Sequence, residues 1–360
     1  MLRVGACLSL TGRFSRFGVQ AAHGLAAWRV LDRGAEVVVE DDGSDPARVE
    51  PCLRAVADRC DLLLGPYSTQ LMRVASQVAV DLGLVVWNHG GSGDDVERAA
   101  PGHVVSVLTP TSRYAEPFLR HLAGRATAAP LWLAEGRGSF GRQVVAGAVA
   151  MADELGLQTV PIPLDDQLPV DCPPAGWDLF CAGSFEEDVA RIEAARTLAA
   201  TPRVIGAVAA GVRDFSQAVT SAEGVFGIAQ WFPGRGTDVE VGPAERDFLL
   251  AYTELTGTMP DYPAVQAAAA AVIATYCARA AGGLSRETLW EAATGLRTNT
   301  LYGPFGIDPI SGAQRDHETA LVRWAANGLT SVRPATSTLP SDQRRGADRA
   351  SEARRGPTDY

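Results

Sequence analysis

Two short polar turns, each preceded by a run of apolar residues, carry the residue types best suited to hold a small molecule. The apolar run 62–64 leads into a turn that ends at Ser68 and Thr69, and the run 84–87 leads into the turn 88–92. Hydroxyl groups in such turns offer hydrogen bonds to a polar ligand. Ser68 and Thr69 also stand where a helix is expected to begin, and free backbone N–H groups at a helix start favour an anionic group. The pattern indicates a binding site.

Parallel strands are needed to bring these two turns together. The runs 62–64 and 84–87 have the length and composition of buried strands, and the segment that starts at Thr69 has that of a helix. Strand and helix alternate along most of the chain, which predicts α/β architecture with parallel sheets covered on both faces. In open sheets of this kind, ligands bind at the carboxyl edge beside a topological switch point.

The alternation predicts two successive α/β units. Strands are expected at residues 3–10, 36–40, 62–64, 84–87, 103–108, 130–134, 157–162, 177–182, 203–208 and 225–230. Helices are expected at residues 18–31, 46–59, from 69 onward, 112–124, 140–155, 185–198, 213–221, 242–256, 262–281 and 285–295. A Pro/Gly-rich connector covers 231–241, residues 302–328 suggest a hairpin, and the polar tail 333–360 is expected to be disordered.

Composition limits the partners that the protein can have. The chain of 360 residues is 46% hydrophobic and 21% charged, which is typical of a soluble protein with two domains. A net charge of -10 argues against binding to nucleic acid or to an anionic membrane. The alanine-rich run 264–281 is interrupted by Gln266, Tyr276 and Arg279, so no direct insertion into a membrane is expected. No signal peptide is recognised at the N-terminus, which favours a soluble, unexported chain.

Metal, cofactor and disulfide sites are not predicted. The six cysteines form no C-x-x-C pair, and Cys52 and Cys60 are too far apart along one helix for a bridge, so mostly free thiols are expected. Asp94 and Asp95 could coordinate a cation, but a helix-capping role is favoured because no third carboxylate has calcium-loop spacing. The glycines of GRGSFG do not form a dinucleotide fingerprint, so no cofactor is expected.

Catalysis is the least favoured of the functional readings. The sequence has no G-x-S-x-G elbow, no H-E-x-x-H pair and no lysine for Schiff-base chemistry. His89 could act as a general base, but no acid or nucleophile has a suitable spacing, and a loop histidine is favoured. The sequence alone is equally consistent with Ser68 as a helix cap and with Ser68 as a ligand contact. The acidic run 186–188 is first interpreted as favourable charge at a helix start.

Seven segments, in order, resemble the type I periplasmic binding proteins. They are GACLSLTGRFSRFG, VVVEDDGSDP, LLLGPYSTQ, VVWNHGGSGDD, SFG, CAGSFEEDVA and YGPFGIDPISG. Within that family the chain is most similar to the branched-chain amino acid, amide and urea receptors of ABC importers, over about residues 2–328. The resemblance implies two Rossmann-like lobes joined by three crossovers, with the ligand cleft between them. The implied lobes are residues 1–112 plus 237–303 and residues 113–236 plus 304–332, with crossovers near 109–113, 232–239 and 300–305.

The resemblance also implies which residues contact the ligand. Ser68 and Thr69 match the groups that hold an amino acid's carboxylate. The other matched or candidate contacts are Gly90, Gly91, Ser92, Phe17, Phe140, Phe185 and Asp214. The family's ammonium-binding glutamate falls at 209–211, where this chain has no acid. Asp214, Glu186 or Glu135 could compensate, but an amide, urea-like or carboxylate ligand becomes more plausible than a cationic amine.

The function implied by the resemblance is non-enzymatic. A solute-binding receptor would close on a small polar ligand, such as an amino acid, an amide or a urea-like molecule, and deliver it to an ABC permease. This implies a periplasmic or extracytoplasmic location. The alternative is a cytoplasmic small-molecule sensor that regulates a partner protein, as in the amide-sensing branch of the family. An enzyme on a similar scaffold ranks third.

Overall fold

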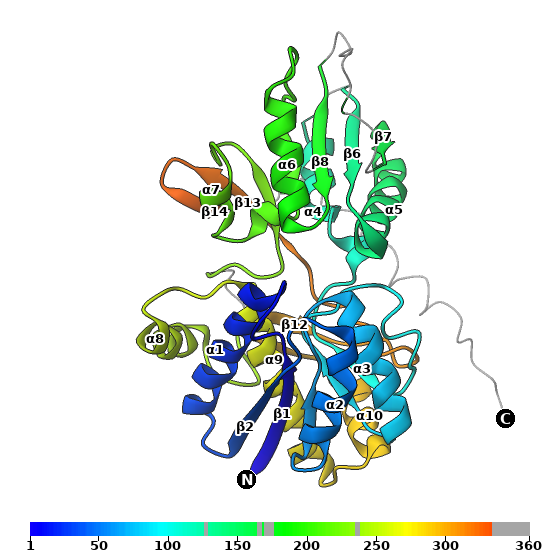
Figure 1. Ribbon diagram of the computed structural model, residues 1–360, viewed down its shortest axis with the longest axis vertical. Helices are drawn as coiled ribbons and strands as arrows, with labels where there is room; N and C mark the ends of the chain where they lie inside the picture. Colours follow the sequence, from blue (N-terminus) through cyan, green and yellow to red (C-terminus); the bar gives the residue numbers. More distant parts are fainter. Residues whose placement is uncertain (126–128, 164–167, 169–175, 235–237, 333–360) are drawn as a thin grey trace, which may run out of the picture.

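The computed structural model describes residues 1–125, 129–163, 168, 176–234 and 238–332. Two lobes, each built on its own sheet, lie one above the other in Figure 1. This confirms the expected α/β architecture. The tail expected to be disordered, residues 333–360, and the proposed lobe boundary at 237 lie outside the described residues.

The first lobe contains a five-stranded parallel sheet in the order β2-β1-β3-β4-β5. Its strands are β1 (Leu2–Leu8), β2 (Ala35–Asp41), β3 (Leu62–Leu64), β4 (Val86–Asn88) and β5 (Val104–Ser106). The chain moves outward from β1 to β2 and then returns to the other side of β1 for β3. This reversal is the topological switch point, and the polar turns after β3 and β4 lie beside it.

Helices cover both faces of this sheet. They are α1 (Ser15–Leu31), α2 (Pro46–Ala57), α3 (Thr69–Leu82), α8 (Glu245–Thr256), α9 (Tyr262–Ala281) and α10 (Arg286–Gly295). Successive residues of β1 point to opposite faces. Ala6 packs with α1 and α9, whereas Cys7 packs with α2 and α3. Gly24 lets α1 approach α9 closely, since a Cβ there would collide with the Ala264 carbonyl.

Helix α9 is the one described helix with the length and composition of a membrane span, and it forms part of the core of the first lobe. It packs against α1, α10, β3 and β4. Most of its residues are buried, and its many alanines give a flat surface for close packing. The apolar composition of 264–281 is explained by this burial.

The second lobe contains a seven-stranded sheet in the order β14-β13-β10-β9-β8-β6-β7. Its strands are β6 (Leu131–Glu135), β7 (Thr159–Ile162), β8 (Asp178–Ala182), β9 (Ile205–Ala207), β10 (Phe226–Ala229), β13 (Ala320–Ala325) and β14 (Gly328–Ser331). Strands β6 to β10 are parallel, and β13 and β14 add an antiparallel edge. The helices are α4 (Glu116–Ala123), α5 (Gly138–Leu155), α6 (Phe185–Arg196) and α7 (Phe215–Ala218).

Three expected elements differ in the structure. The helix expected at 112–124 is a 3-10 turn at Thr111–Arg113 followed by α4, and the helix expected at 213–221 is limited to the four residues of α7. The hairpin expected at 302–328 is wrong. Strand β12 (Gly303–Phe305) pairs instead with β11 (Thr298–Thr300), and β13 pairs with β14.

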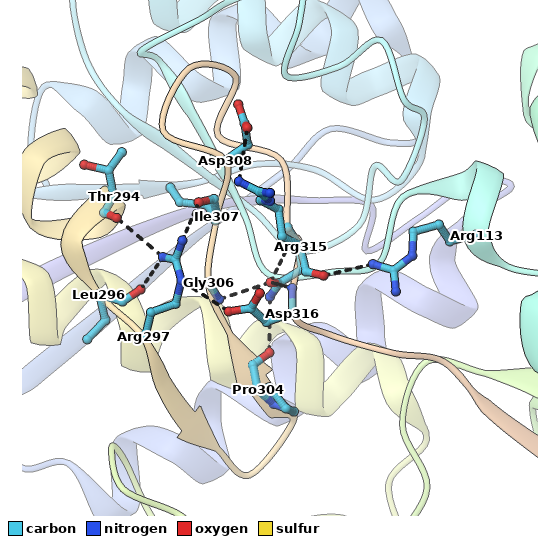
Figure 2. Close-up of polar contacts among 11 residues, drawn as sticks. Arg113, Thr294, Leu296, Arg297, Pro304, Gly306, Ile307, Asp308, Arg315 and Asp316 are labelled. Atoms are coloured by element: carbon cyan, nitrogen blue, oxygen red, sulfur yellow. Dashed lines mark hydrogen bonds and ion pairs between the residues drawn. The ribbon is translucent and has the colours of Figure 1, made fainter. Parts of the chain in front are cut away.

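Residues 304–317, expected in the second lobe, lie against the first. Ile307 belongs to the core of the first lobe, and the Ser106 N–H donates to the Gly312 carbonyl. Figure 2 shows the Arg297 side chain bound to the Ile307 carbonyl (3.2 Å) and to the Asp316 carboxylate (3.3 Å). We therefore propose that the third crossover follows residue 317 and that β13 is the first element beyond it.

Candidate functional site

Side chains from both lobes meet directly between the two sheets. The Arg73 guanidinium of α3 donates to Ser139 Oγ of α5 (2.7 Å). The Gln143 side chain of α5 donates to Asp95 Oδ1 (2.8 Å) and accepts from the Asp94 N–H (3.1 Å). The turns after β3 and β4 are therefore close to the facing surface of the second lobe.

Ser68 and Thr69 occupy the turn after β3 as the sequence predicted. Ser68 Oγ caps α3 by accepting from the Leu71 N–H (3.3 Å), and the Ser68 N–H donates to the Gly90 carbonyl (3.0 Å). Thr69 Oγ1 accepts from the Gly93 N–H (3.0 Å). The two polar turns are thus bonded to each other. Ser68 also has φ of 93°, a strained conformation of the kind that clusters at functional sites.

Gly90 and Gly91 lie beside Ser68, but their amide hydrogens are already used. Both N–H groups donate to Asn88 Oδ1, at 3.2 and 2.9 Å. A side chain at Gly90 would come within 2.6 Å of the Tyr67 Cα, and one at Gly91 would collide with Met72. Their contribution is therefore a compact turn rather than free donors.

Asn88 and Glu97 belong to a hydrogen-bond network that holds this turn. Asn88 Nδ2 donates to the Gly91 carbonyl (2.7 Å) and to Ser106 Oγ (2.7 Å). Ser106 Oγ and Asn88 Nδ2 both donate to Glu97 Oε1. Glu97 is only 5% exposed, and this burial raises its pKa to about 7. Neither residue could be predicted from the sequence, because neither lies in a recognisable motif.

Ser92 connects the second turn to the first crossover. Its carbonyl accepts from the Thr111 N–H (2.8 Å), and its Oγ accepts from Thr111 Oγ1 (2.9 Å). Tyr114 follows in the same segment, and burial raises its pKa, so the phenol stays neutral. The predicted contact residue Ser92 therefore lies where the two lobes join.

Aromatic rings from both lobes surround this region. Phe17 of α1 stacks on Tyr67, with 4.4 Å between ring centroids. Phe140 of α5 contacts Tyr114 edge-on at 5.7 Å. Phe185, at the start of α6, lies under the Arg16 guanidinium, which is 4.0 Å from the ring centroid. All three predicted aromatic residues thus pair with a residue that the sequence analysis did not single out.

A buried polar chain links the segments that connect the lobes. Gln266 Nε2 donates to Tyr302 Oη (3.0 Å), which donates to Gln230 Oε1 (2.7 Å). The Thr109 N–H donates to the same Gln230 oxygen (3.2 Å). His317 stacks on Tyr302 at 4.1 Å and lies 2.6 Å from Thr109 Oγ1. Within the described residues, Gln266 Oε1 is buried without a partner.

The segment 209–211, where the family's glutamate would lie, forms a short 3-10 turn held by Asp188. Asp188 accepts from the Gly183 N–H (2.7 Å) and the Ala209 N–H (2.9 Å). It is 1% exposed, and burial raises its pKa to about 7. Asp188 stands in the first turn of α6 together with Glu186 and Glu187, as expected, and it also holds the 209–211 turn. Glu187 forms a capping box with Ser184 at the same helix start.

The other acids near this region are exposed, paired or only half-buried. Glu186 has a side chain that is 68% exposed and lies 3.8 Å from Arg16. Asp261 is paired with the Arg213 guanidinium (3.1 Å), which comes from the other lobe. Asp214, predicted as a contact, is half-buried, and its side chain makes no capping bond to α7. The Arg16 Nη1 atom, by contrast, is buried and has no partner in the described part of the chain.

The sequence candidates for a general base and for a cation site were His89 and the pair Asp94 and Asp95. His89 is buried, and desolvation lowers its pKa to about 4, so its ring is neutral. Asp94 caps the first crossover by accepting from the Ser112 N–H (3.0 Å). Asp95 binds Arg73, which lowers its pKa to about 2. The residues that the structure describes contain no group of three potential metal ligands.

A separate cavity of about 300 Å³ opens between the end of α1, residues 241–243 and the second half of α9. Trp28, Tyr276 and Arg279 are among its lining residues. It includes none of the predicted contact residues, and Arg279 is already paired with Asp32 (2.9 Å). The candidate site predicted from the sequence therefore lies apart from this cavity.

Comparisons with known proteins agree with this architecture. The family model described as "Periplasmic binding protein" matches residues 2–329. The leucine-binding protein LivK from Thermotoga maritima has a similar structure, with a TM-score of 0.78 and 15% identity over 92% of this chain and 98% of that chain. No curated protein sequence matches the chain.

Two further solved structures share the fold. A solute-binding protein of an ABC transporter from Rhodopseudomonas palustris, in complex with 3,4-dihydroxybenzoic acid, has a TM-score of 0.74 and 14% identity over 92% of this chain and 95% of that chain. LivJ from Streptococcus pneumoniae, in complex with isoleucine, has a TM-score of 0.73 and 14% identity over 93% and 100%. The expected type I fold with two lobes is confirmed. The chain belongs to the periplasmic binding protein family, and it is a solute-binding protein rather than an enzyme.

Proposed function

We propose that this receptor closes its lobes on a small organic carboxylate that carries no cationic amine. An aromatic acid is the ligand class that fits best, and a neutral amide is second. The predicted contacts Ser68, Thr69 and Ser92 would hold the polar head group. The aromatic residues of both lobes would enclose its body.

Arg16 is the observation that carries this proposal. Within the described residues its Nη1 atom is buried without a partner, while its Nη2 atom lies 3.8 Å from the exposed Glu186 carboxylate and its guanidinium lies over the Phe185 ring. An unpaired buried donor on a charged group is costly unless a ligand completes it, and an anion does so best. Residues 209–211 supply no acid for an ammonium group, and their Ala209 N–H is turned towards Asp188.

The turn after β3 adds a second group that favours an anion. Thr69 is the first residue of α3, where backbone N–H groups have no helical acceptor and the helix dipole is positive. Ser68 Oγ already accepts from Leu71, so its hydroxyl hydrogen is the part that remains to be donated to a ligand. A carboxylate accepts from both groups, whereas an ammonium group accepts from neither.

The shape of the lining favours a flat ligand. The Phe17–Tyr67 stack belongs to the first lobe and the Tyr114–Phe140 pair lies at the second. Flat rings pack well between aromatic side chains. The fold accommodates such ligands, since solute-binding proteins with this architecture have been solved with 4-hydroxybenzoate and with benzoate. The same fold also accommodates leucine. The fold therefore does not determine the ligand class, and we infer that class from the charge at the site.

We further propose that the receptor delivers its ligand to an ABC permease on the extracytoplasmic side of the membrane. Membership of the periplasmic binding protein family supports this proposal. Closure of the lobes would change the surface that a permease contacts, as hinge motions do in other ligand-binding proteins.

A thermal-shift screen tests the ligand class. The full chain is heated with benzoate, hydroxybenzoates, benzamide, leucine and isoleucine, each in excess. Because a ligand that binds only the folded state raises the unfolding temperature, the acids without an amine should give the largest shifts. Larger shifts with leucine or isoleucine than with every aromatic acid would overturn the proposal. In that case Asp214→Asn should remove the shift if Asp214 supplies the counter-charge.

A further inference from the structure

The side chains of Cys7 and Cys52 pack in the same core cluster of the first lobe. Cys7 lies on β1 and Cys52 lies on α2. Cys7 Sγ also lies 3.6 Å from Asp42 Oδ2, and Cys52 Sγ lies 3.4 Å from the Asp41 carbonyl. We propose that Cys7 and Cys52 are a redox-active pair that closes to a disulfide between β1 and α2.

The packing of α2 on β1 explains why these two cysteines meet. A Cβ on Gly5 would lie 2.7 Å from the Val56 Cβ, so this helix rests directly on the strand. Cys7 is on the same face of β1 as Gly5, two residues further along. Cys52 is one helical turn before Val56, which brings it over Cys7. Cys60 lies instead over Gly5, where the strand has no thiol.

The two cysteines have complementary properties for thiol–disulfide exchange. Cys52 is half-buried, and the neighbouring Cys7 and Arg48 lower its pKa. Cys7 is fully buried, and the neighbouring Cys52 together with burial raises its pKa. Cys52 is therefore the thiolate that meets a reagent, and Cys7 is the resolving thiol.

The oxidant is a small-molecule disulfide such as oxidised glutathione. The Cys52 thiolate attacks one sulfur of that disulfide, which forms a mixed disulfide and releases one thiolate. Cys7 then loses its proton and attacks Cys52 Sγ, which forms the Cys7–Cys52 bond and releases the second thiolate. Two protein thiols are oxidised, and one small-molecule disulfide is reduced to two thiols.

The pair lies beneath the loop that leads into α1. Asp42 accepts from Ser9 Oγ (2.6 Å), and Asp41 accepts from the Leu10 N–H (2.9 Å). Disulfide formation removes the S–H group of Cys7 that faces Asp42. Oxidation should therefore change the contacts of the loop that precedes Arg16 and Phe17. The disulfide also constrains the unfolded chain, so the unfolding temperature should rise.

The test uses the reduced, folded full chain, treated with oxidised glutathione. Free thiols are then counted under denaturing conditions, and the crosslinked peptides are mapped by mass spectrometry. The wild type should lose two of its six thiols, with a Cys7–Cys52 crosslink. The Cys60→Ser variant is the matched control and should lose two of its remaining five.

Single variants separate the two roles. Cys7→Ser should stop at a glutathione adduct on Cys52, and Cys52→Ser should form no internal crosslink. The unfolding temperature should rise on oxidation in the wild type and in Cys60→Ser alone. The proposal is overturned if the native wild type keeps all its thiols, if Cys52→Ser still loses a pair, or if the mapped crosslink joins other cysteines.

Discussion

Replacing Glu97 by Gln should remove a pH-dependent loss of stability that originates beneath the ligand-binding turn. Glu97 is 5% exposed, and burial raises its pKa from 4.5 to about 7. Between these values the folded state keeps the proton and the unfolded state does not. Stability therefore falls as pH rises through this window, and the loss is complete once the folded carboxyl is ionised. Glutamine keeps the Oε1 acceptor for Ser106 and Asn88 without the charge.

The size of the effect follows from the pKa change. A rise from 4.5 to about 7 corresponds to roughly 3 kcal/mol, and this net rise already includes the Ser106 and Asn88 hydrogen bonds that favour the ionised form. At about pH 8, Glu97→Gln should be more stable than the wild type by about 1–3 kcal/mol, and at about pH 5 the two should be equal. Asp188 and His89 also titrate in this range but are common to both proteins, so their contributions cancel.

Urea unfolding of both proteins across this pH range measures the difference. The same titration with a bound ligand reports whether the turn at Gly91 depends on the charge of Glu97. A wild-type stability that falls with pH no more steeply than that of Glu97→Gln would refute the reasoning. So would a variant that is less stable at about pH 8.

Three further substitutions test the supports of the site. Ser68→Ala should cost about 1 kcal/mol of stability through the lost helix cap and should weaken ligand binding in calorimetry; unchanged affinity would remove Ser68 from the site. Asp188→Ala should cost about 2–5 kcal/mol in urea unfolding because two buried N–H groups lose their acceptor, whereas Glu186→Ala on the exposed side should stay within about 0.5 kcal/mol. Gly91→Ala should reduce stability by about 1–3 kcal/mol and impair ligand binding, since its Cβ meets Met72, while Gly295→Ala, which meets nothing, should do neither.

The sequence was most informative where local patterns determine the structure. Buried strands such as 62–64 and the helix that begins at Thr69 follow from apolar runs, a polar turn and a capping serine, and they have the predicted boundaries. The alternation of such elements predicted two α/β lobes. The two polar turns lie together because parallel strands place their carboxyl ends at one edge.

Residues that act through long-range contacts were not predictable. Tyr302 bonds Gln266 and Gln230, which lie 36 and 72 residues away in the chain. Asp188 was interpreted only as one of three acids at a helix start, and only the fold shows that it also binds the 209–211 turn. The loop 306–317 carries turn-forming residues that fit either lobe, so its place on the first lobe depends on contacts such as that between Ser106 and Gly312.

The central claim is that the lobes bind a carboxylate and provide no counter-charge for an amine. The most direct test is calorimetric titration of the full chain with hydrocinnamate and with phenylalanine, which differ only by the α-ammonium group. We expect hydrocinnamate to bind at least about tenfold more tightly, because a buried ammonium group without a partner costs more than 1.4 kcal/mol. Phenylalanine binding as tightly as hydrocinnamate, or more tightly, would contradict the account.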